Sequence, residues 1–423
     1  MSERSVEVVV QIGGDDVLAG RLWAHRRGSN ESATFVYDPS YLADPRAYAL
    51  EPALPLSAGQ QHTALGREMF AAFSDCAPDR WGRRLIARDE RRRARADGTA
   101  ERSFAEIDYL LGVRDDLRQG AVRFRDSSSG VYLAPDDSGV PHLIDLPVLL
   151  NAADRMERDE AGEEELQTLL RGGSSLGGAR PKAHVLDQSG RVAIAKFPNT
   201  AGDEWDVIRW EAVALQLAAA AGISVPNFQL HLIDDKGVLI VDRFDRVGER
   251  RVGYVSAMTM LEAKDGDTRS YLEIADVIER ESAQAGADLS ELWRRIAFSI
   301  LISNTDDHLR NHGFLRTSSS GWTLAPAFDL NPDPQPGEKH LSTAVDFNDT
   351  SASLELLHNV DAYFRIGDRE SARILREVVT AIDSWRDVAR KQGLTDSAID
   401  EMAPAFEHSQ AREAENLLAH AAP

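Results

Sequence analysis

Two stretches of sequence decide how this chain folds: Asn304-Thr305-Asp306-Asp307-His308-Leu309-Arg310-Asn311 and, further along, Ala327-Phe328-Asp329-Leu330. Asp306 and Asn311 are five positions apart, the D-x-x-x-x-N spacing of a kinase catalytic loop. In such a loop the aspartate takes the proton of the attacking hydroxyl and the asparagine helps to hold a metal ion. Asp329 lies 18 residues beyond Asn311, where a second carboxylate for the same metal is expected. Oxygen ligands suit Mg²⁺, so the spacing predicts a phosphoryl-transfer site.

The residues before the first stretch favour a functional site over a chance match. The spacing alone recurs in many proteins, and an Asp–His–Asn cluster can simply cap a helix. However, residues 296–302 (IAFSILI) form an apolar run that we expect to be buried, and this run delivers several polar residues at its end. Packing does not require such a cluster, whereas a site does.

A glycine-rich stretch and a lysine lie upstream in the order found in kinases. The stretch is Gly172-Gly173-Ser174-Ser175-Leu176-Gly177-Gly178-Ala179-Arg180-Pro181-Lys182. Its glycines would let backbone N–H groups approach phosphate oxygens, and Arg180 and Lys182 supply charge. It matches neither G-x-G-x-x-G nor a Walker A loop, so a flexible hairpin is the alternative. Lys196 then ends the run Val192-Ala193-Ile194-Ala195-Lys196, which is similar to the V-A-I-K strand whose lysine grips nucleotide phosphates.

Two further positions belong to the same pattern. Glu211 lies on a predicted amphipathic helix over 204–221, where it is a candidate partner of Lys196; a solvated carboxylate is the equal alternative. Asp242-Arg243-Phe244 follow a predicted strand and are placed like a hinge between lobes, where backbone groups would meet adenine.

The composition describes a globular protein of more than one domain. The chain has 423 residues, of which 43% are hydrophobic and 28% charged, and two domains or lobes are expected at this length. No apolar run approaches the roughly 18–20 residues that span a bilayer, and the first residues do not resemble a signal peptide, so we expect a cytoplasmic protein. Cys76 is the only cysteine, which excludes an internal disulfide and a cysteine-based zinc site, and it is expected in the core.

The charge of the chain bears on nucleic-acid binding. A net charge of −21 argues against broad direct contact with DNA or RNA phosphates. One local exception is an arginine cluster over 80–95 with interspersed acidic residues. We interpret it as a solvated, ion-paired helix face; the alternative is a phosphate-binding surface.

Periodicity predicts mixed α/β structure before residue 246 and mostly helices after it. Strands are expected within 5–37 and at 120–124, 183–187, 192–197, 228–233 and 238–242, with a hairpin at 314–324. Helices are expected at 66–96 (interrupted near 77–78), 104–112, 146–171, 204–221, 271–283, 289–303, 352–357, 368–392 and 396–419. The predicted domains are 1–125, 126–245 and 246–423.

These motifs together make the chain resemble the HipA family, the serine/threonine-kinase toxins of bacterial type II toxin–antitoxin modules. The resemblance covers nearly the whole length. In the N-terminal region it rests on Gly20-Arg21-Leu22, Phe35-Val36-Tyr37-Asp38, Pro78-Asp79-Arg80-Trp81-Gly82 and Gly120-Ala121-Val122. In the kinase core it rests on 177–182, 195–197, 242–245, 304–311 and 326–330.

The resemblance implies a fold, an activity and a set of site residues. The fold is a two-lobed α/β (α+β) protein-kinase-like core related to phosphoinositide-kinase-like folds, with an N-terminal mixed α/β subdomain and a mostly helical C-terminal lobe. The activity is ATP- and Mg²⁺-dependent protein phosphorylation. By motif position Asp306 is the general base, Asn311 and Asp329 hold Mg²⁺, and Lys196 contacts the phosphates. The remaining implied nucleotide-site residues are Gly177, Gly178, Ala179, Arg180, Pro181, Lys182, Asp242, Arg243, Phe244, His308 and Phe328.

The resemblance also implies regulation and partners. Family members autophosphorylate a loop serine, which is Ser175 here, although the adjacent Ser174 leaves the choice open. Substrates in the family include aminoacyl-tRNA synthetases, whose modification promotes dormancy (persistence). The usual partner is a small helix-turn-helix antitoxin that carries the pair to operator DNA. Two departures, Asp242 where Glu is frequent and Arg180-Pro181 where some relatives have Gln-Glu, remove no group that the chemistry needs.

Two other functions stay open beside an active protein kinase. One is a catalytically silent binding module that acts with an antitoxin in repression. The other is a kinase of a small molecule or lipid, which would use the same core on a different acceptor.

Overall fold

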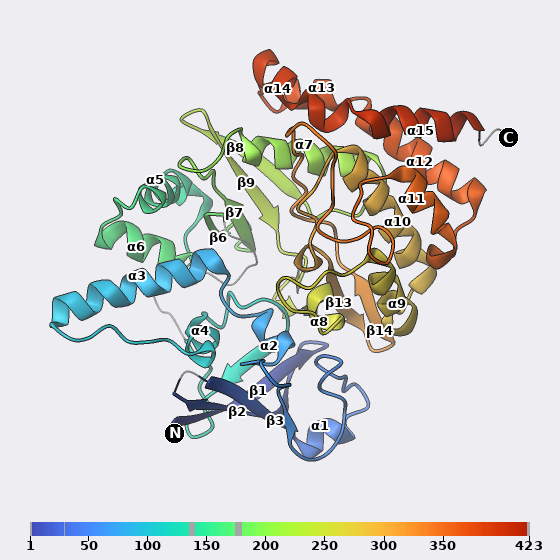
Figure 1. Ribbon diagram of the computed structural model, residues 1–423. Helices are drawn as coiled ribbons and strands as arrows, with labels where there is room; N and C mark the ends of the chain where they lie inside the picture. Colours follow the sequence, from blue (N-terminus) through green and yellow to red (C-terminus); the bar gives the residue numbers. More distant parts are fainter. Residues whose placement is uncertain (1, 29, 135–139, 174–179, 421–423) are drawn as a thin grey trace. The chain divides into compact units, whose positions relative to one another are not determined.

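The chain divides into two compact units in the computed structural model, which describes residues 2–28, 30–134, 140–173 and 180–420. Unit 1 consists of residues 1–202 and 240–255, and unit 2 of residues 203–239 and 256–423. The chain thus passes between units at 202–203, 239–240 and 255–256, a different course from the three predicted domain ranges. Figure 1 labels the elements named below.

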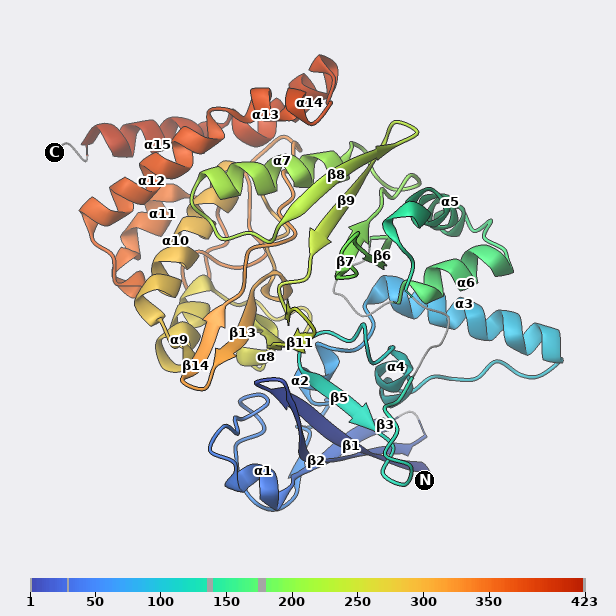
Figure 2. The same cartoon turned by 180° about the vertical axis from the view of Figure 1, so that it is seen from behind.

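Unit 1 begins with an antiparallel sheet of five strands. The strands are β1 (Ser2–Ile12), β2 (Asp15–Arg27), β3 (Asn30–Tyr37), β4 (Gln61–His62) and β5 (Val122–Arg125), in the order β4-β3-β2-β1-β5. Figure 2 shows β5 lying beside β1. Gly20 of β2 is required where it crosses β3, because a Cβ there would lie 2.2 Å from the Val36 carbonyl oxygen. The predicted strands within 5–37 and at 120–124 are confirmed.

An aromatic core lies against this sheet. Phe73 of α2 (Ala71–Ser74) meets Phe35 of β3 and Phe124 of β5 edge to face, with centroid distances of 5.7 Å in both pairs. Such contacts add to the area that large aromatic side chains bury. Cys76 is buried beside them and donates to the Phe73 carbonyl at 3.1 Å, and burial raises the pKa of its thiol to about 11. Its predicted place in the core is confirmed.

Helices make up much of the rest of unit 1. They are α1 (Pro39–Ala43), α3 (Arg80–Asp97), α4 (Glu106–Gly112), α5 (Leu146–Glu157) and α6 (Glu163–Arg171), with a short 3₁₀ turn, η1, at Leu143–Asp145. The prediction of one helix over 146–171 is wrong. The chain leaves α5 with Asp159 in the left-handed conformation at φ 62°, and Gly162 caps α6.

The arginines of α3 are largely ion-paired, as predicted. Arg83 meets Glu106 at 2.6 Å, and Arg84 meets Glu157 at 2.9 Å. Arg92 lies 2.9 Å from Glu163, within the acidic run that opens α6. These pairs satisfy the arginines within unit 1 and support the interpretation as an ion-paired helix face.

The lysine hairpin of unit 1 consists of β6 (Lys182–Leu186) and β7 (Val192–Lys196), which pair antiparallel with Lys182 opposite Lys196. Unit 1 also contains the short pair β10 (Arg246–Val247) and β11 (Arg250–Arg251). Strand β9 (Lys236–Asp242), the neighbour of β8 (Phe228–Ile233), runs from unit 2 into unit 1, and β12 (Gly253–Ser256) returns to unit 2.

Unit 2 is built around α10 (Ala285–Leu301). Its apolar residues, with Trp293 2% and Phe298 0% exposed, are buried, as the run before the first motif predicts. The helix packs against α9 (Tyr271–Glu281), α11 (Leu354–Asn359) and α12 (Asp368–Ile382), and Figure 2 shows these helices gathered around it.

The remaining elements complete unit 2. They are α7 (Val207–Ala220), α8 (Ala257–Met260), the hairpin β13 (Gly313–Ser318) and β14 (Gly321–Leu324), the 3₁₀ turns η2 (Leu309–Asn311) and η3 (Asp361–Phe364), α13 (Trp385–Lys391), α14 (Asp396–Phe406) and α15 (Ser409–His420). The helices predicted at 368–392 and 396–419 each prove to be two, interrupted at 383–384 and 407–408. Among the described residues, no helix is both long and apolar enough to cross a bilayer.

Candidate active site

The predicted catalytic loop starts at a Schellman motif that ends α10. Ser303 takes the left-handed conformation at φ 54°, its N–H bonds to the Ile300 carbonyl at 3.3 Å, and the Asn304 N–H bonds to the Ser299 carbonyl at 2.8 Å. Glycine is the usual residue at the left-handed position. Ser303 is fully buried, and its hydroxyl donates to the Ala405 carbonyl at 3.0 Å. The loop therefore leaves the helix in a fixed direction.

The loop brings Asp306 and Asn311 together. The Asn311 side-chain amide donates to the main-chain carbonyl of Asp306 at 3.1 Å, and the Asn311 N–H donates to the His308 carbonyl at 2.8 Å. Asn311 is 7% exposed, whereas Asp306 is exposed. Because the NH₂ group faces a carbonyl, the amide oxygen is the atom of Asn311 left to act as a metal ligand.

The stretch that contains Asp329 is bonded to the start of the same loop. The Asn331 N–H donates to the Asn304 side-chain oxygen at 3.1 Å, and the Asp333 N–H donates to the Ser303 carbonyl at 3.1 Å. Asp329 itself lies in the left-handed region at φ 60°, a conformation that costs energy in a residue other than glycine and is found at functional sites. Asn304 thus joins the two motifs, a role that the sequence did not reveal.

Beneath the loop lies a buried carboxylate. Asp307 is 4% exposed and accepts from the Tyr271 hydroxyl at 2.6 Å and the Ser299 hydroxyl at 3.2 Å, with the His312 ring 3.2 Å away. Burial acts to raise the pKa of Asp307, but His312 and these donors hold it below its usual value. Burial and the neighbouring Asp307 raise the pKa of Tyr271 well above normal.

Asp307 also anchors a later segment through its backbone. Its carbonyl accepts from the Thr343 hydroxyl at 2.7 Å. Asp307 therefore has the contacts of a structural residue that holds the loop, in contrast to its exposed neighbour Asp306. No spacing in the sequence pointed to its partner Tyr271, which lies 36 positions upstream.

Unit 1 contains the predicted phosphate lysine, Lys196, half-buried at the end of β7. Lys182, opposite it, has a partner that the sequence did not predict. Its ammonium lies 2.8 Å from Asp79, and both side chains are buried, at 7% and 3% exposure. The Pro181 carbonyl accepts from the Phe197 N–H at 2.9 Å, which extends the pairing at the open end of the hairpin. Arg180 is half-buried.

The hinge-like residues are also in unit 1. The Arg243 side chain is 1% exposed; it pairs with Asp245 and donates to the Leu117 carbonyl at 2.7 Å. The Arg243 side chain is thus occupied within the core, and its predicted contact with nucleotide stays a prediction. Asp242 and Phe244 are half-buried.

The glycine-rich segment lies mostly outside the described residues. This holds for the predicted nucleotide residues Gly177, Gly178 and Ala179 and for both candidate phosphorylation sites, Ser174 and Ser175. Of the predicted catalytic and metal residues, the structure places Asp306, Asn311 and Asp329 in unit 2 and the phosphate lysine Lys196 in unit 1. His308 and Phe328, both half-buried, are also in unit 2.

The donor set in unit 2 fits a hard divalent cation. The oriented amide oxygen of Asn311 and the carboxylate of Asp329 are oxygen ligands from segments that are bonded to each other. Mg²⁺ is commonly held by one or two such groups, with substrate phosphates and water completing the shell. Asn311 and Asp329 are therefore the candidate ligands for a divalent cation among the predicted site residues.

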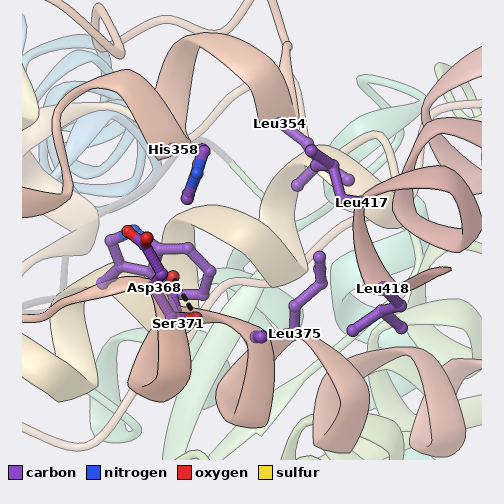
Figure 3. A pocket seen from close by; sticks show the side chains of 9 residues that line it. Leu354, His358, Asp368, Ser371, Leu375, Leu417 and Leu418 are labelled. Carbon is purple, nitrogen blue, oxygen red and sulfur yellow. Dashed lines mark hydrogen bonds between the residues drawn. The ribbon is translucent and has the colours of Figure 1, made fainter. Parts of the chain in front are cut away.

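A separate cavity in unit 2 contains none of the predicted site residues. It measures about 190 Å³ and is lined by Trp293, Leu354, His358, Asp368, Ser371, Ala372, Leu375, Leu417 and Leu418. Figure 3 shows His358 and Asp368 on one side of it and Leu354, Leu417 and Leu418 on the other. His358 Nδ1 lies 2.8 Å from Asp361, closer than the roughly 3.3 Å between ligand atoms on a tetrahedral zinc ion, so these two atoms do not have the spacing of a zinc site.

Comparison with known proteins finds two family domains and a similar protein. Residues 174–386 match the HipA-like C-terminal domain, and residues 10–108 match the HipA N-terminal domain. The chain is 24% identical over 417 residues to a protein of Sinorhizobium fredii (strain NBRC 101917 / NGR234) named "Putative kinase Y4mE", a match that covers 91% of this chain and 86% of that protein.

A solved structure shares the fold. HipA from the toxin–antitoxin system of Shewanella oneidensis MR-1, determined with HipB and its operator DNA, matches with a TM-score of 0.64 at 16% identity, over 98% of this chain and 96% of that one. The mixed α/β content and the antiparallel sheets agree with this match. The predicted fold class is confirmed.

Proposed function

This chain belongs to the HipA family, and from that premise we propose that it is an ATP- and Mg²⁺-dependent serine/threonine-protein kinase. The observation that carries the proposal is the loop of unit 2, in which the Asn311 amide bonds to the Asp306 carbonyl while the Asp329 segment bonds to Asn304. This arrangement keeps the proposed base and the two proposed metal ligands on segments that are hydrogen-bonded to each other.

The role of each residue is the one that the family resemblance implies. Asp306, exposed at the loop, accepts the proton of the acceptor hydroxyl as that oxygen bonds to the γ-phosphorus and the bond to the leaving diphosphate breaks. Asn311 and Asp329 would hold Mg²⁺, which would neutralise charge on the phosphates. By the family resemblance, Lys196 contacts the phosphates, and the implied nucleotide-site residues within the described part of the chain are 180–182, 242–244, His308 and Phe328.

The biological role follows from the family. The kinase acts as the toxin of a type II module, paired with a small helix-turn-helix antitoxin that contacts operator DNA. The net charge of −21 supports DNA contact through a basic partner rather than through this chain. The acceptor is a protein, with an aminoacyl-tRNA synthetase as the first substrate to test, and Ser175 is the autophosphorylation site.

A phosphotransfer assay tests the activity. Asp306→Asn is expected to abolish transfer of the γ-phosphate to protein while leaving binding of a fluorescent ATP analogue intact, because the amide cannot take the proton. An undiminished rate would remove Asp306 from its role. A wild-type chain that binds ATP but transfers no phosphate supports the silent binding module, and transfer only to small hydroxyl compounds or lipids supports the other alternative.

Mass spectrometry after incubation with Mg-ATP tests the autophosphorylation site. Phosphate is expected on Ser175 and to be lost in Ser175→Ala but retained in the matched variant Ser174→Ala. Phosphate that persists in Ser175→Ala contradicts the assignment.

A further inference from the structure

The N-terminal part of unit 1 contacts the lysine hairpin through a buried ion pair. The Asp79 carboxylate lies 2.8 Å from the Lys182 ammonium, 103 positions along the chain. The Trp81 indole N–H, also buried, donates to the Lys182 main-chain carbonyl at 3.0 Å. Two neighbouring residues therefore hold both the side chain and the backbone of Lys182.

The Asp79 carboxylate is fixed at both of its oxygens. One oxygen faces Lys182, and the other accepts from the Gly82 N–H at 2.7 Å, which caps α3. Burying an ion pair is costly, and a packed apolar pair of the same volume often stabilises a fold at least as well. A buried pair with both partners fully oriented is therefore better explained by a need for position than by a need for stability.

Register connects this pair to the phosphate lysine. Lys182 lies directly opposite Lys196 in the antiparallel hairpin, so the two side chains project from the same face. Two cations in that relation repel each other. Asp79 supplies the opposing charge beside one of them, and the Phe197 N–H to Pro181 carbonyl bond holds the strands together just beyond the pair.

From these contacts we infer that Asp79 is a positioning residue for Lys196. Asp79 binds the Lys182 ammonium and so offsets the repulsion between the two lysines. As a result, β7 presents Lys196 to nucleotide phosphates in one orientation. The region that matches the HipA N-terminal domain is then a working part of the nucleotide site rather than an appended module. This inference rests on the proposed function.

Three variants of the full chain test it, with the dissociation constant of a fluorescent ATP analogue and hydrogen exchange of the apo protein as readouts. Asp79→Asn keeps the cap but turns an amide donor toward an ammonium donor. It should weaken nucleotide binding roughly 10- to 100-fold, as loss of a supporting contact commonly does, and should speed exchange at residues 192–197. The matched control is Glu106→Gln, which changes the partly exposed Arg83–Glu106 pair at the same end of α3 and should leave both readouts as in the wild type.

The double variant Asp79→Asn with Lys182→Gln restores a neutral, complementary pair. It should fold, and its hydrogen exchange at residues 192–197 should return to within a few-fold of the wild-type rate. Full affinity in Asp79→Asn, or a double variant that folds but keeps the fast exchange of Asp79→Asn, would overturn the inference. A wild-type chain that fails to bind the analogue would overturn the proposed function itself, so the two failures are distinguishable.

Discussion

The Tyr271 hydroxyl donates a 2.6 Å hydrogen bond to the buried carboxylate of Asp307, directly beside the proposed base Asp306. Removing the hydroxyl in Tyr271→Phe leaves that carboxylate with fewer donors in a site closed to water. We expect a loss of about 1–3 kcal/mol in the free energy of unfolding, measured by urea denaturation. Tyr363→Phe, at a 46% exposed tyrosine, is the control and should change stability by no more than about 0.5 kcal/mol. Equal stability of the two variants would contradict a supporting role for Tyr271.

The orientation of the Asn311 amide gives a prediction about metal dependence. In the wild type, the Asp306 carbonyl accepts a 3.1 Å hydrogen bond from the Asn311 amide. Asn311→Asp replaces this donor with an acceptor, so the side chain must rotate and its ligand oxygen moves. Phosphate transfer is expected to fall roughly 100-fold, as small displacements of catalytic groups commonly cause, and to need more Mg²⁺ for half-maximal rate. The exposed Asn348→Asp should behave as the wild type. An unchanged Mg²⁺ requirement in Asn311→Asp would argue against Asn311 as a ligand.

Ser303 gives a prediction that separates two effects at one position. Ser303→Ala and Ser303→Gly both lose the hydroxyl's bond to Ala405, but only glycine tolerates the left-handed φ of 54° without strain. Ser303→Gly should therefore be the more stable of the two by about 1 kcal/mol, the usual preference of this conformation. Thermal unfolding of the two variants measures the difference. A more stable alanine variant would mean that this turn rearranges.

Much of this site was predictable because its signals are local. The spacing of Asp306 and Asn311 is a property of one loop, and the apolar run before it predicted burial of α10 because an unbroken stretch of apolar residues can be read directly from the sequence. The parts that escaped prediction depend on residues distant in the sequence. The charge of Lys182 predicts a place near phosphate, but its contact with Asp79, 103 positions away along the chain, has no local signal in the sequence.

Helix breaks escaped prediction for a different reason. The sequence around Asp159 keeps a helical period, yet the chain turns there, with α5 and α6 packing against each other and Arg155 paired with Glu165 across the break. Tertiary packing outweighed propensity at this point, as it commonly does over short windows.

His184 makes the stability of unit 1 depend on pH. The ring is buried; its Nδ1–H donates to the Gly172 carbonyl at 2.9 Å, and its Nε2 accepts from Arg243 at 3.2 Å. Burial, followed by the charge of Arg243, lowers the pKa of His184 from 6.5 to about 3. Between these values the unfolded chain binds a proton that the native ring does not. Stability should therefore fall as the pH falls below 6.5, by up to about 1.4 kcal/mol per pH unit from this residue.

Urea denaturation between pH 4.5 and 6.5 measures this slope, above the range in which carboxylates with lowered pKa, such as Asp245 and Asp307, take up protons. His184→Asn retains a donor for the Gly172 carbonyl but cannot titrate, so its stability should depend less on pH than that of the wild type. The exposed His340→Asn should keep the wild-type slope. If His184→Asn also kept that slope, the native ring would have to bind its proton as readily as the unfolded one, and the hydrogen bond from Arg243 to Nε2 could not exist in solution.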